Sequence, residues 1–443
     1  MGATKRLAEF IHDLSYDDLS EEAVAKAKLC LMDWLGVAVR GYIAGRREMD
    51  SMIDALTPFF GQPQATLLTK KTRVDVLNAA LINGTASHYL DYDDVHPMML
   101  GHPSVPIMPA VLALGELKGA NGKVLITAIV AGFEAQCKIG EAVWQVHYKA
   151  GWHATSTLGC FGACAAAAKI LGLNTEKIIN SLGTAGTQAF GSQQSFGTMT
   201  KPFHAGKAAS NGVLAAILAE RGFTGPQEII EGPKGFSKLY SSKFDETKIN
   251  NFGKPFEIES TAYKRHASCY GTHSAITGTL KIREKYHPEI EKIDSINIKA
   301  SWLTLNVADK LEPKTGLEGK FSVGYCVALA LLKGRAFESD FTDELVNSKE
   351  VKDLMNKIKV IRDESFGELE SEVEINMKNG QTIKEKTNIA TEFFIKANEW
   401  VPIVEMKFTD LVKDALPTKG VRNIVDTIKN LEKKDDLKWL TQV

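Results

Sequence analysis

Three histidines and three aspartates stand within fifteen residues of this chain, and such a density of titratable side chains indicates a site. The cluster comprises His88, Asp91, Asp93, Asp94, His96 and His102. Because clustered carboxylates and imidazoles resist burial, a fold usually keeps them for proton transfer, metal binding or substrate recognition. The residue types alone leave all three kinds of chemistry open.

Two interpretations compete with proton transfer. Imidazole and carboxylate ligands together suit iron, manganese or zinc, so the cluster has the composition of a metal centre. In the purely structural interpretation, Asp93 and Asp94 cap helices or pair with arginines, His88 is a satisfied core histidine, and His96, next to Pro97, is exposed in a loop. For His88 taken singly, the core role is favoured.

The elements that position the cluster are predicted to be helices. A helix beginning after Asp75 places His88 and Asp91 on one face and stops at Pro97, and Ser104 is predicted to cap the next helix. Two alanine-rich stretches, residues 157–168 and 204–217, predict closely packed central helices. The polar segments before them contain His153 and Lys201, so these side chains are expected at helix N-termini, which attract anions.

The pattern changes after about residue 260. Residues 293–299 and 358–361 are β-branched and charged, with a period of two. Residues 372–384 alternate apolar and polar side chains around Asn379-Gly380, which is a strong hairpin signal. A smaller α+β domain is therefore expected, and from Trp400 the helical pattern returns.

Composition excludes several classes of protein. The length of 443 residues predicts two domains. With 53 Lys+Arg against 54 Asp+Glu the chain carries almost no net charge, so no overall electrostatic field attracts nucleic acid or an anionic membrane. The sequence contains no apolar run of about 18 residues, so no membrane-spanning helix is predicted. Six scattered cysteines, with no secretory signal at the N-terminus, favour a reducing cytoplasm. The signatures of P-loop, dinucleotide-binding, zincin and α/β-hydrolase proteins are absent.

Several segments together resemble the MmgE/PrpD family, whose members include 2-methylcitrate dehydratase, cis-aconitate decarboxylase and iminodisuccinate epimerase. The resemblance covers nearly the whole chain. The segments that carry it are LMDWLG at 31–36, NGTASHYLDYDD at 83–94, GHPS at 101–104, TKPFH at 200–204, YKR at 263–265 and FSVGY at 321–325.

The resemblance implies a mainly α fold: a large all-helical domain built from both chain ends, residues 1–262 and 400–443, plus an inserted smaller α+β lid domain, residues 263–399. It also implies a homodimer that uses no metal or organic cofactor and acts on a small polycarboxylate between helical domain and lid. The implied catalytic residues are His102, Asp91, His153, Lys201 and Tyr325. The implied substrate-binding residues are Lys264, Arg265, Cys269 and Ser104.

Members of the family remove a proton α to a carboxylate, or CO₂, to form an enolate-like anion. In this scheme His102 moves the proton, because an unperturbed imidazole pKa of about 6.5 suits neutral pH. Asp91 orients His102, and His153 is the second imidazole or caps the helix that follows it. Lys201, Lys264 and Arg265 hold carboxylates and offset developing charge, although Lys264 and Arg265 are equally consistent with a surface pair. Tyr325 places a hydroxyl near the leaving oxygen or is a buried tyrosine bonded to the backbone, and Cys269 is a pocket thiol or packing.

Departures from the family pattern guide the choice of reaction. The decarboxylases resemble this chain but carry histidine where Cys269 stands and threonine where Val95 stands. The loop of residues 95–100 differs from that of the methylcitrate dehydratases. We expect a dehydratase similar to 2-methylcitrate dehydratase, with an iminodisuccinate epimerase next, then a cis-aconitate decarboxylase. A metal-dependent enzyme using the aspartates and a non-catalytic carboxylate-binding protein are the alternatives from other classes.

Overall fold

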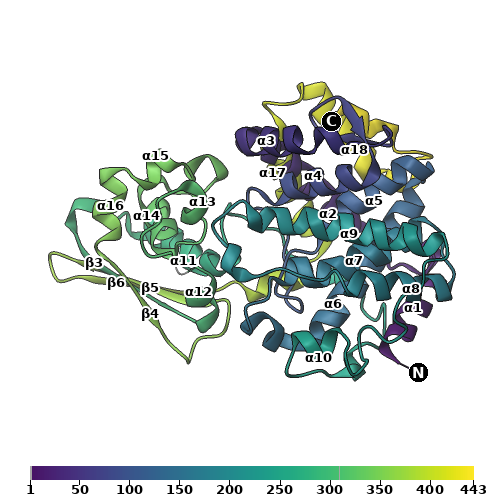
Figure 1. The fold of residues 1–443 in the computed structure, drawn as a ribbon. Helices are drawn as coiled ribbons and strands as arrows, with labels where there is room; N and C mark the ends of the chain where they lie inside the picture. Colours follow the sequence, from purple (N-terminus) through teal and green to yellow (C-terminus); the bar gives the residue numbers. More distant parts are fainter. Residues whose placement is uncertain (1, 309) are drawn as a thin grey trace.

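Helices make up most of the chain in the computed structural model, which describes residues 2–308 and 310–443 (Figure 1). The α-helices are α1 (Ala3–Asp13), α2 (Glu21–Ala44), α3 (Arg46–Leu56), α4 (Val76–His88), α5 (Ser104–Lys118), α6 (Gly122–Lys149), α7 (Ala154–Ile170), α8 (Thr175–Gly186), α9 (Thr200–Glu220), α10 (Phe236–Tyr240), α11 (His273–Tyr286), α12 (Trp302–Val307), α13 (Gly316–Gly319), α14 (Val323–Lys333), α15 (Asp343–Val346), α16 (Lys349–Met355), α17 (Ala397–Val412) and α18 (Thr418–Lys429). The strands are β1 (Ala65–Leu67), β2 (Thr72–Val74), β3 (Ile293–Ala300), β4 (Ile358–Arg362), β5 (Glu370–Met377) and β6 (Thr382–Asn388). The prediction of a mainly α chain is confirmed.

Both ends of the chain contribute to the larger, helical part. Helix α17 packs against α2, and the fully buried side chains of Trp34 and Trp400 belong to one hydrophobic core. Figure 1 shows the C-terminal segment, in yellow, among the N-terminal helices, in purple. Among the described residues, no helix combines the length and the apolar character that a membrane crossing requires.

The smaller α+β part has a core of its own around a four-stranded sheet. The strand order is β4-β3-β5-β6, with β3 and β4 parallel and the other pairs antiparallel. Burial alternates along β5, where Val373 and Ile375 face the core under helix α11, which in turn packs against α14. The predicted Asn379-Gly380 turn is confirmed, and Gly380 has a φ of 88° that suits glycine. Figure 1 shows this part beside the helical part.

Glycines let α4 and α9 approach closely. A Cβ atom on Gly84 would lie 2.6 Å from the Cα of Gly206. His88 follows Gly84 by one helical turn, and Lys201 lies at the start of α9. The close crossing therefore brings an imidazole and an ammonium group, far apart in sequence, to one point.

We expect Gly206→Ala to lower the free energy of unfolding by about 1–3 kcal/mol, because the added methyl group overpacks this crossing. It would press on the main-chain oxygen of Leu81 and lie 2.5 Å from Oγ1 of Thr85. Chemical denaturation measures the change. Gly420→Ala is the matched control, since its Cβ meets Pro417 only at an ordinary 3.5 Å, and helix propensity there favours alanine. Equal destabilisation of both variants would contradict the packing argument.

Three local predictions about the cluster are wrong. Helix α4 does begin after its cap Asp75, but it ends at His88 rather than at Pro97. Asp91 has a φ of 51°, in the left-handed region, so it cannot share the helix face of His88. Ser104 is the first residue of α5 rather than its cap, and its hydroxyl donates to Asp94 at 2.5 Å.

Candidate active site

The cluster lies where four segments converge. The end of α4 supplies His88, and the loop that follows supplies Asp91, Asp93 and His102. The residue before α7 is His153, the second residue of α9 is Lys201, and Lys264 comes from the connection into the α+β part. His102 and Cys269 line a pocket of about 100 Å³ whose wall also includes Val95, Leu303 and Phe393, so the pocket touches both parts of the chain.

Asp91 is held between two ammonium groups. Its Oδ1 accepts from Nζ of Lys201 at 2.9 Å and from Nζ of Lys264 at 3.0 Å, and all three side chains are buried. Burial alone would raise the pKa of this carboxyl, but the two lysines outweigh burial and hold the pKa well below its ordinary value. The ammonium group of Lys201 also faces the rings of Phe196 and Phe321, at 5.5 and 5.3 Å. Asp91 is therefore ionised, and positive charge surrounds it.

Asp93 bridges two imidazoles. Its Oδ1 lies 2.9 Å from Nδ1 of His88, and its Oδ2 lies 2.8 Å from Nδ1 of His102. Nε2 of His88 lies 2.8 Å from Nζ of Lys201, so it accepts from the ammonium group, and Nδ1 of His88 carries the hydrogen. Burial lowers the pKa of His88 to about 4, which keeps this ring neutral. Although burial opposes it, His102 and His88 hold the pKa of Asp93 well below its ordinary value.

His102 is arranged as a base. Its Nδ1 lies 2.9 Å from the main-chain oxygen of Asp94, which can only accept, so Nδ1 carries the hydrogen. Its Nε2 is then a free lone pair, 3.6 Å from Oδ1 of Asp91. Burial lowers the pKa of His102, so the ring is neutral at pH 7 and ready to take a proton.

His153 supplies a second imidazole. Its Nδ1 lies 3.1 Å from Nδ1 of His204, and its ring stacks 5.9 Å from that of His88. Its Nε2 is buried and has no hydrogen-bond partner among the described residues. Burial, followed by the charge of Lys201, places the pKa of His153 well below its ordinary value. The ring is therefore neutral, with one nitrogen left for a ligand.

Asp94 and Ser104 form a buried pair of their own. Ser104 donates to Asp94 through its hydroxyl and also through its main-chain N–H, at 3.1 Å. Burial raises the pKa of Asp94 to about 8, so this carboxyl is neutral at pH 7. The hydroxyl of Ser104 is thus engaged within the loop, and the structure does not offer it to a substrate.

Two other expected site residues also lie outside the cluster. The hydroxyl of Tyr325 donates to the main-chain oxygen of Asp340 at 2.7 Å, as a buried structural tyrosine does. Arg265 forms an ion pair with Glu392 at 2.9 Å and lies over the ring of Trp400. Of the candidate residues only His102 and Cys269 line the pocket; Asp91, Lys201 and Lys264 do not, but they are bonded to one another beside His102, whereas Tyr325 and Arg265 are bonded elsewhere. Both belong to segments that carry the family resemblance and whose neighbours Phe321 and Lys264 lie at the site, which is why the resemblance implied them.

Cys269 does line the pocket, but as a thiol. Burial raises its pKa to about 11, so the nucleophilic thiolate is scarce at neutral pH. His96 is buried rather than exposed, and its Nε2 lies 2.9 Å from the main-chain oxygen of Glu257. The six cysteines are buried and unpaired.

His88 is the buried, fully bonded histidine that the structural interpretation favoured, but the sequence did not indicate its partners or the role of Asp93. The only signal for them was membership of the cluster, because nothing in their spacing shows that one carboxylate joins the rings of His88 and His102. The suggested arginine partners of Asp93 and Asp94 are replaced by these two histidines and by Ser104.

The donor atoms of this cluster also satisfy the spacing of a metal site. Ligand atoms of His88, Asp91, Asp93 and His102 lie within 4.8 Å of one another. However, Lys201 already binds both Oδ1 of Asp91 and Nε2 of His88, and Lys264 binds the same oxygen. Two ammonium groups at that point would repel a divalent cation. The arrangement fits proton transfer better than metal binding.

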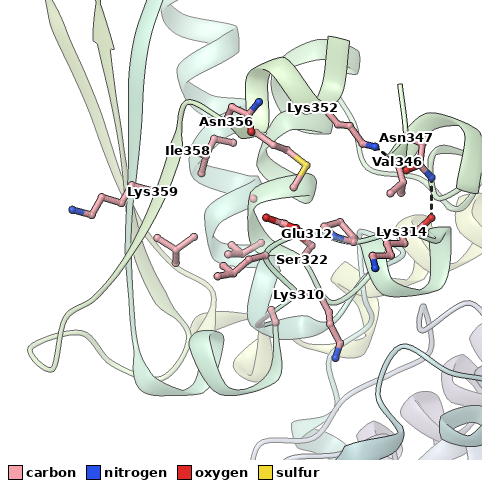
Figure 2. Close-up of a pocket in the computed structure, with 17 residues that line it drawn as sticks. Lys310, Glu312, Lys314, Ser322, Val346, Asn347, Lys352, Asn356, Ile358 and Lys359 are labelled. Atoms are coloured by element: carbon pink, nitrogen blue, oxygen red, sulfur yellow. Dashed lines mark hydrogen bonds between the residues drawn. The ribbon is translucent and has the colours of Figure 1, made fainter. Parts of the chain in front are cut away.

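A larger cavity lies within the α+β part. It measures about 650 Å³ and is lined by Lys310, Lys314 and Lys352 and by the apolar side chain of Ile358 (Figure 2). Figure 2 shows the hydrogen bonds of Asn347 to Lys352 and to the main chain of Lys314. Among the described residues that line it there is no histidine and a single carboxylate, Glu312, so these residues offer no acid–base pair.

Comparisons with known proteins match the whole length of the chain. Models of the MmgE/PrpD N-terminal domain and the MmgE/PrpD C-terminal domain match residues 5–248 and 266–433. Human cis-aconitate decarboxylase is 26% identical over 99% of this chain and 93% of its own length. The mitochondrial 2-methylcitrate dehydratase of Yarrowia lipolytica is 24% identical over 95% of this chain and 85% of its own. The 2-methylcitrate dehydratase of Escherichia coli is 24% identical over 80% and 76%.

Proposed function

This chain belongs to the MmgE/PrpD family, and we propose that it is a cofactor-independent lyase that removes a proton α to a carboxylate of a small di- or tricarboxylate. The observation that carries the proposal is that His102 is a neutral imidazole whose Nδ1–H is hydrogen-bonded and whose Nε2 is free to accept a proton. Its Nδ1–H donates to the main-chain oxygen of Asp94, with the carboxylate of Asp93 2.8 Å from the same nitrogen, and its ring lies at the pocket with Nε2 3.6 Å from Oδ1 of Asp91. The named relatives are lyases of both kinds, decarboxylase and dehydratase.

In the proposed reaction the C–H bond breaks and its proton moves to Nε2 of His102. The electron pair forms the C=C bond as hydroxide leaves, and the imidazolium of His102 returns its proton to the leaving oxygen, so that water is released and the base is regenerated. The carboxylate of Asp93 stabilises the imidazolium of His102. Lys201 and Lys264 offset the negative charge of the substrate and of the enolate-like anion, as charge-assisted hydrogen bonds would.

We propose dehydration, as in 2-methylcitrate dehydratase, as the reaction. Val95 and Cys269 both line the pocket, so the two positions that carry threonine and histidine in the decarboxylases hold an apolar group and a protonated thiol here. Decarboxylation of cis-aconitate is the second candidate, because relatives of that name match 99% of the chain. A lid role for the α+β part, a homodimer and a cytoplasmic location belong to the same proposal.

Proton NMR in D₂O tests the reaction, with EDTA-treated enzyme and 2-methylcitrate, citrate, cis-aconitate and iminodisuccinate supplied separately. A new vinyl signal from a hydroxy acid establishes the dehydratase. Formation of itaconate identifies the decarboxylase, and loss of the α-proton signal without an alkene identifies an epimerase. If none of the four acids reacts until a divalent metal is added, the cofactor-independent mechanism is refuted. Binding without turnover or proton exchange would indicate a carboxylate-binding protein instead.

A further inference from the structure

Three consecutive main-chain carbonyls at the site each accept a hydrogen bond from a different buried lysine. The carbonyl of Leu90 accepts from Lys320 at 2.7 Å, and that of Asp91 accepts from Lys264 at 2.8 Å. The carbonyl of Tyr92 accepts from Lys407. These carbonyls lie in a loop between α4 and α5, without the hydrogen-bond partners that a helix would give them.

The three lysines come from three separate parts of the chain. Lys320 follows α13 in the α+β part, Lys264 lies in the connection, and Lys407 lies on α17 in the C-terminal return. Each has less than a tenth of its surface exposed. Burying an ammonium group away from water costs free energy, so three buried ammonium groups bonded to one tripeptide indicate that the fold depends on the position of this backbone.

The backbone that they fix is unusual. Asp91, the central residue, has a φ of 51°, which costs an L-residue roughly 1–2 kcal/mol. The side chains on either side, Leu90 and Tyr92, are buried in the core of the α+β part. Left-handed geometry at Asp91 sets the direction of its carboxylate toward Lys201, Lys264 and His102.

We propose that Lys320 and Lys407 are positioning residues, which act through the Leu90–Tyr92 backbone to aim the Asp91 carboxylate at His102 and Lys201. Lys320 is the more informative of the two, because its ammonium group also donates to the main-chain oxygen of Ala267, at 2.9 Å. It therefore joins the Leu90–Tyr92 backbone to the start of the α+β part. A displacement of the α+β part relative to the helical part would therefore move Lys320, the carbonyl of Leu90 and, with it, Asp91.

Lys320→Met tests the proposal, because methionine has nearly the same shape but no donor. Lys320 donates to two main-chain oxygens rather than to a carboxylate, and Asp91, whose charge it feels, keeps Lys201 and Lys264 as partners in the variant. We expect kcat to fall about 30-fold, since a misplacement of about 1 Å can cost up to about 100-fold, while KM changes less than about threefold. A crystal structure of the variant should show the Leu90–Tyr92 backbone rearranged.

Lys26→Met is the matched control. Lys26 is also buried and donates to a main-chain carbonyl, that of Thr261, at 2.7 Å. Burial lowers the pKa of both lysines to about 8, so the two substitutions remove comparable groups. We expect similar losses of unfolding free energy, but a kcat within about threefold of wild type for Lys26→Met. Equal losses of kcat in both variants, or wild-type kcat in Lys320→Met, would overturn the proposal.

The kinetic test rests on the proposed function, and a second readout separates the two. If the wild-type protein turns over none of the four acids, ¹⁵N NMR of histidine-labelled protein still reports the environment of His102, whose signal a His102→Asn sample assigns. A shift in Lys320→Met but not in Lys26→Met supports positioning, and an unchanged signal refutes it. If Lys320→Met does not fold, the double variant Asp33→Asn/Lys407→Met replaces it. This variant removes the hydrogen bond from Lys407 to the carbonyl of Tyr92 and also the charge of Asp33, the ion-pair partner of Lys407 at 2.7 Å. The same shift of the His102 signal decides the outcome.

Discussion

His102→Asn should lower kcat by about 10³- to 10⁴-fold, which spans the upper part of the usual contribution of a general base. Asparagine places its amide nitrogen close to where Nδ1 stands, so the hydrogen bond to the main-chain oxygen of Asp94 can persist. What disappears is Nε2, the lone pair that takes the substrate proton. Steady-state kinetics on the acid identified by NMR measure the loss, and KM should change little because His102 carries no charge at rest.

His96→Gln is the control for this substitution. His96 lines the same pocket and is more deeply buried than His102, but its Nε2 is already hydrogen-bonded to the main-chain oxygen of Glu257, a bond that a glutamine amide can replace. We expect its kcat to stay within about tenfold of wild type. Turnover by His102→Asn at the wild-type rate would remove the base from the proposed mechanism.

The fold could be predicted where local pattern decides it. The Asn379-Gly380 hairpin follows from turn chemistry and alternation, and the start of α4 follows from the cap at Asp75. The end of α4 could not be predicted in the same way. Nothing local forbids a helix through Asp91, and the left-handed turn there depends on lysines that come from distant parts of the chain.

The residues of the site also divide into those that the sequence pattern indicated and those whose partners depend on tertiary packing. Clustering alone pointed to Asp91 and His102, whereas Lys201 and Lys264 were placed with them only through the family resemblance. Partners set by tertiary packing escaped prediction, because the ring of His88 meets Lys201 across a gap of 113 residues. Tyr325 matches the motif, but its hydroxyl donates to the main-chain oxygen of Asp340, which agrees with the second alternative, a buried tyrosine bonded to the backbone.

Asp93→Asn should lower kcat by about 10³-fold, although Asp93 does not line the pocket. Its two oxygens now accept from Nδ1 of His88 and contact Nδ1 of His102. An amide must turn an N–H toward one of these rings, which favours the wrong tautomer, and it leaves the imidazolium of His102 without a counter-charge. The loss of turnover that follows replacement of the aspartate in a serine-protease triad has the same origin.

The pH profile distinguishes this role from mere destabilisation. The charge of Asp93 raises the pKa of His102 and so opposes the lowering by burial. Without that charge the pKa of His102 falls further, and because the base acts in its neutral form, the acid limb of kcat/KM should move to lower pH in Asp93→Asn. Asp94→Asn is the control, since burial already keeps that carboxyl neutral at pH 7 and its substitution removes no charge there. An acid limb that stays in place in Asp93→Asn would mean that Asp93 does not act through His102.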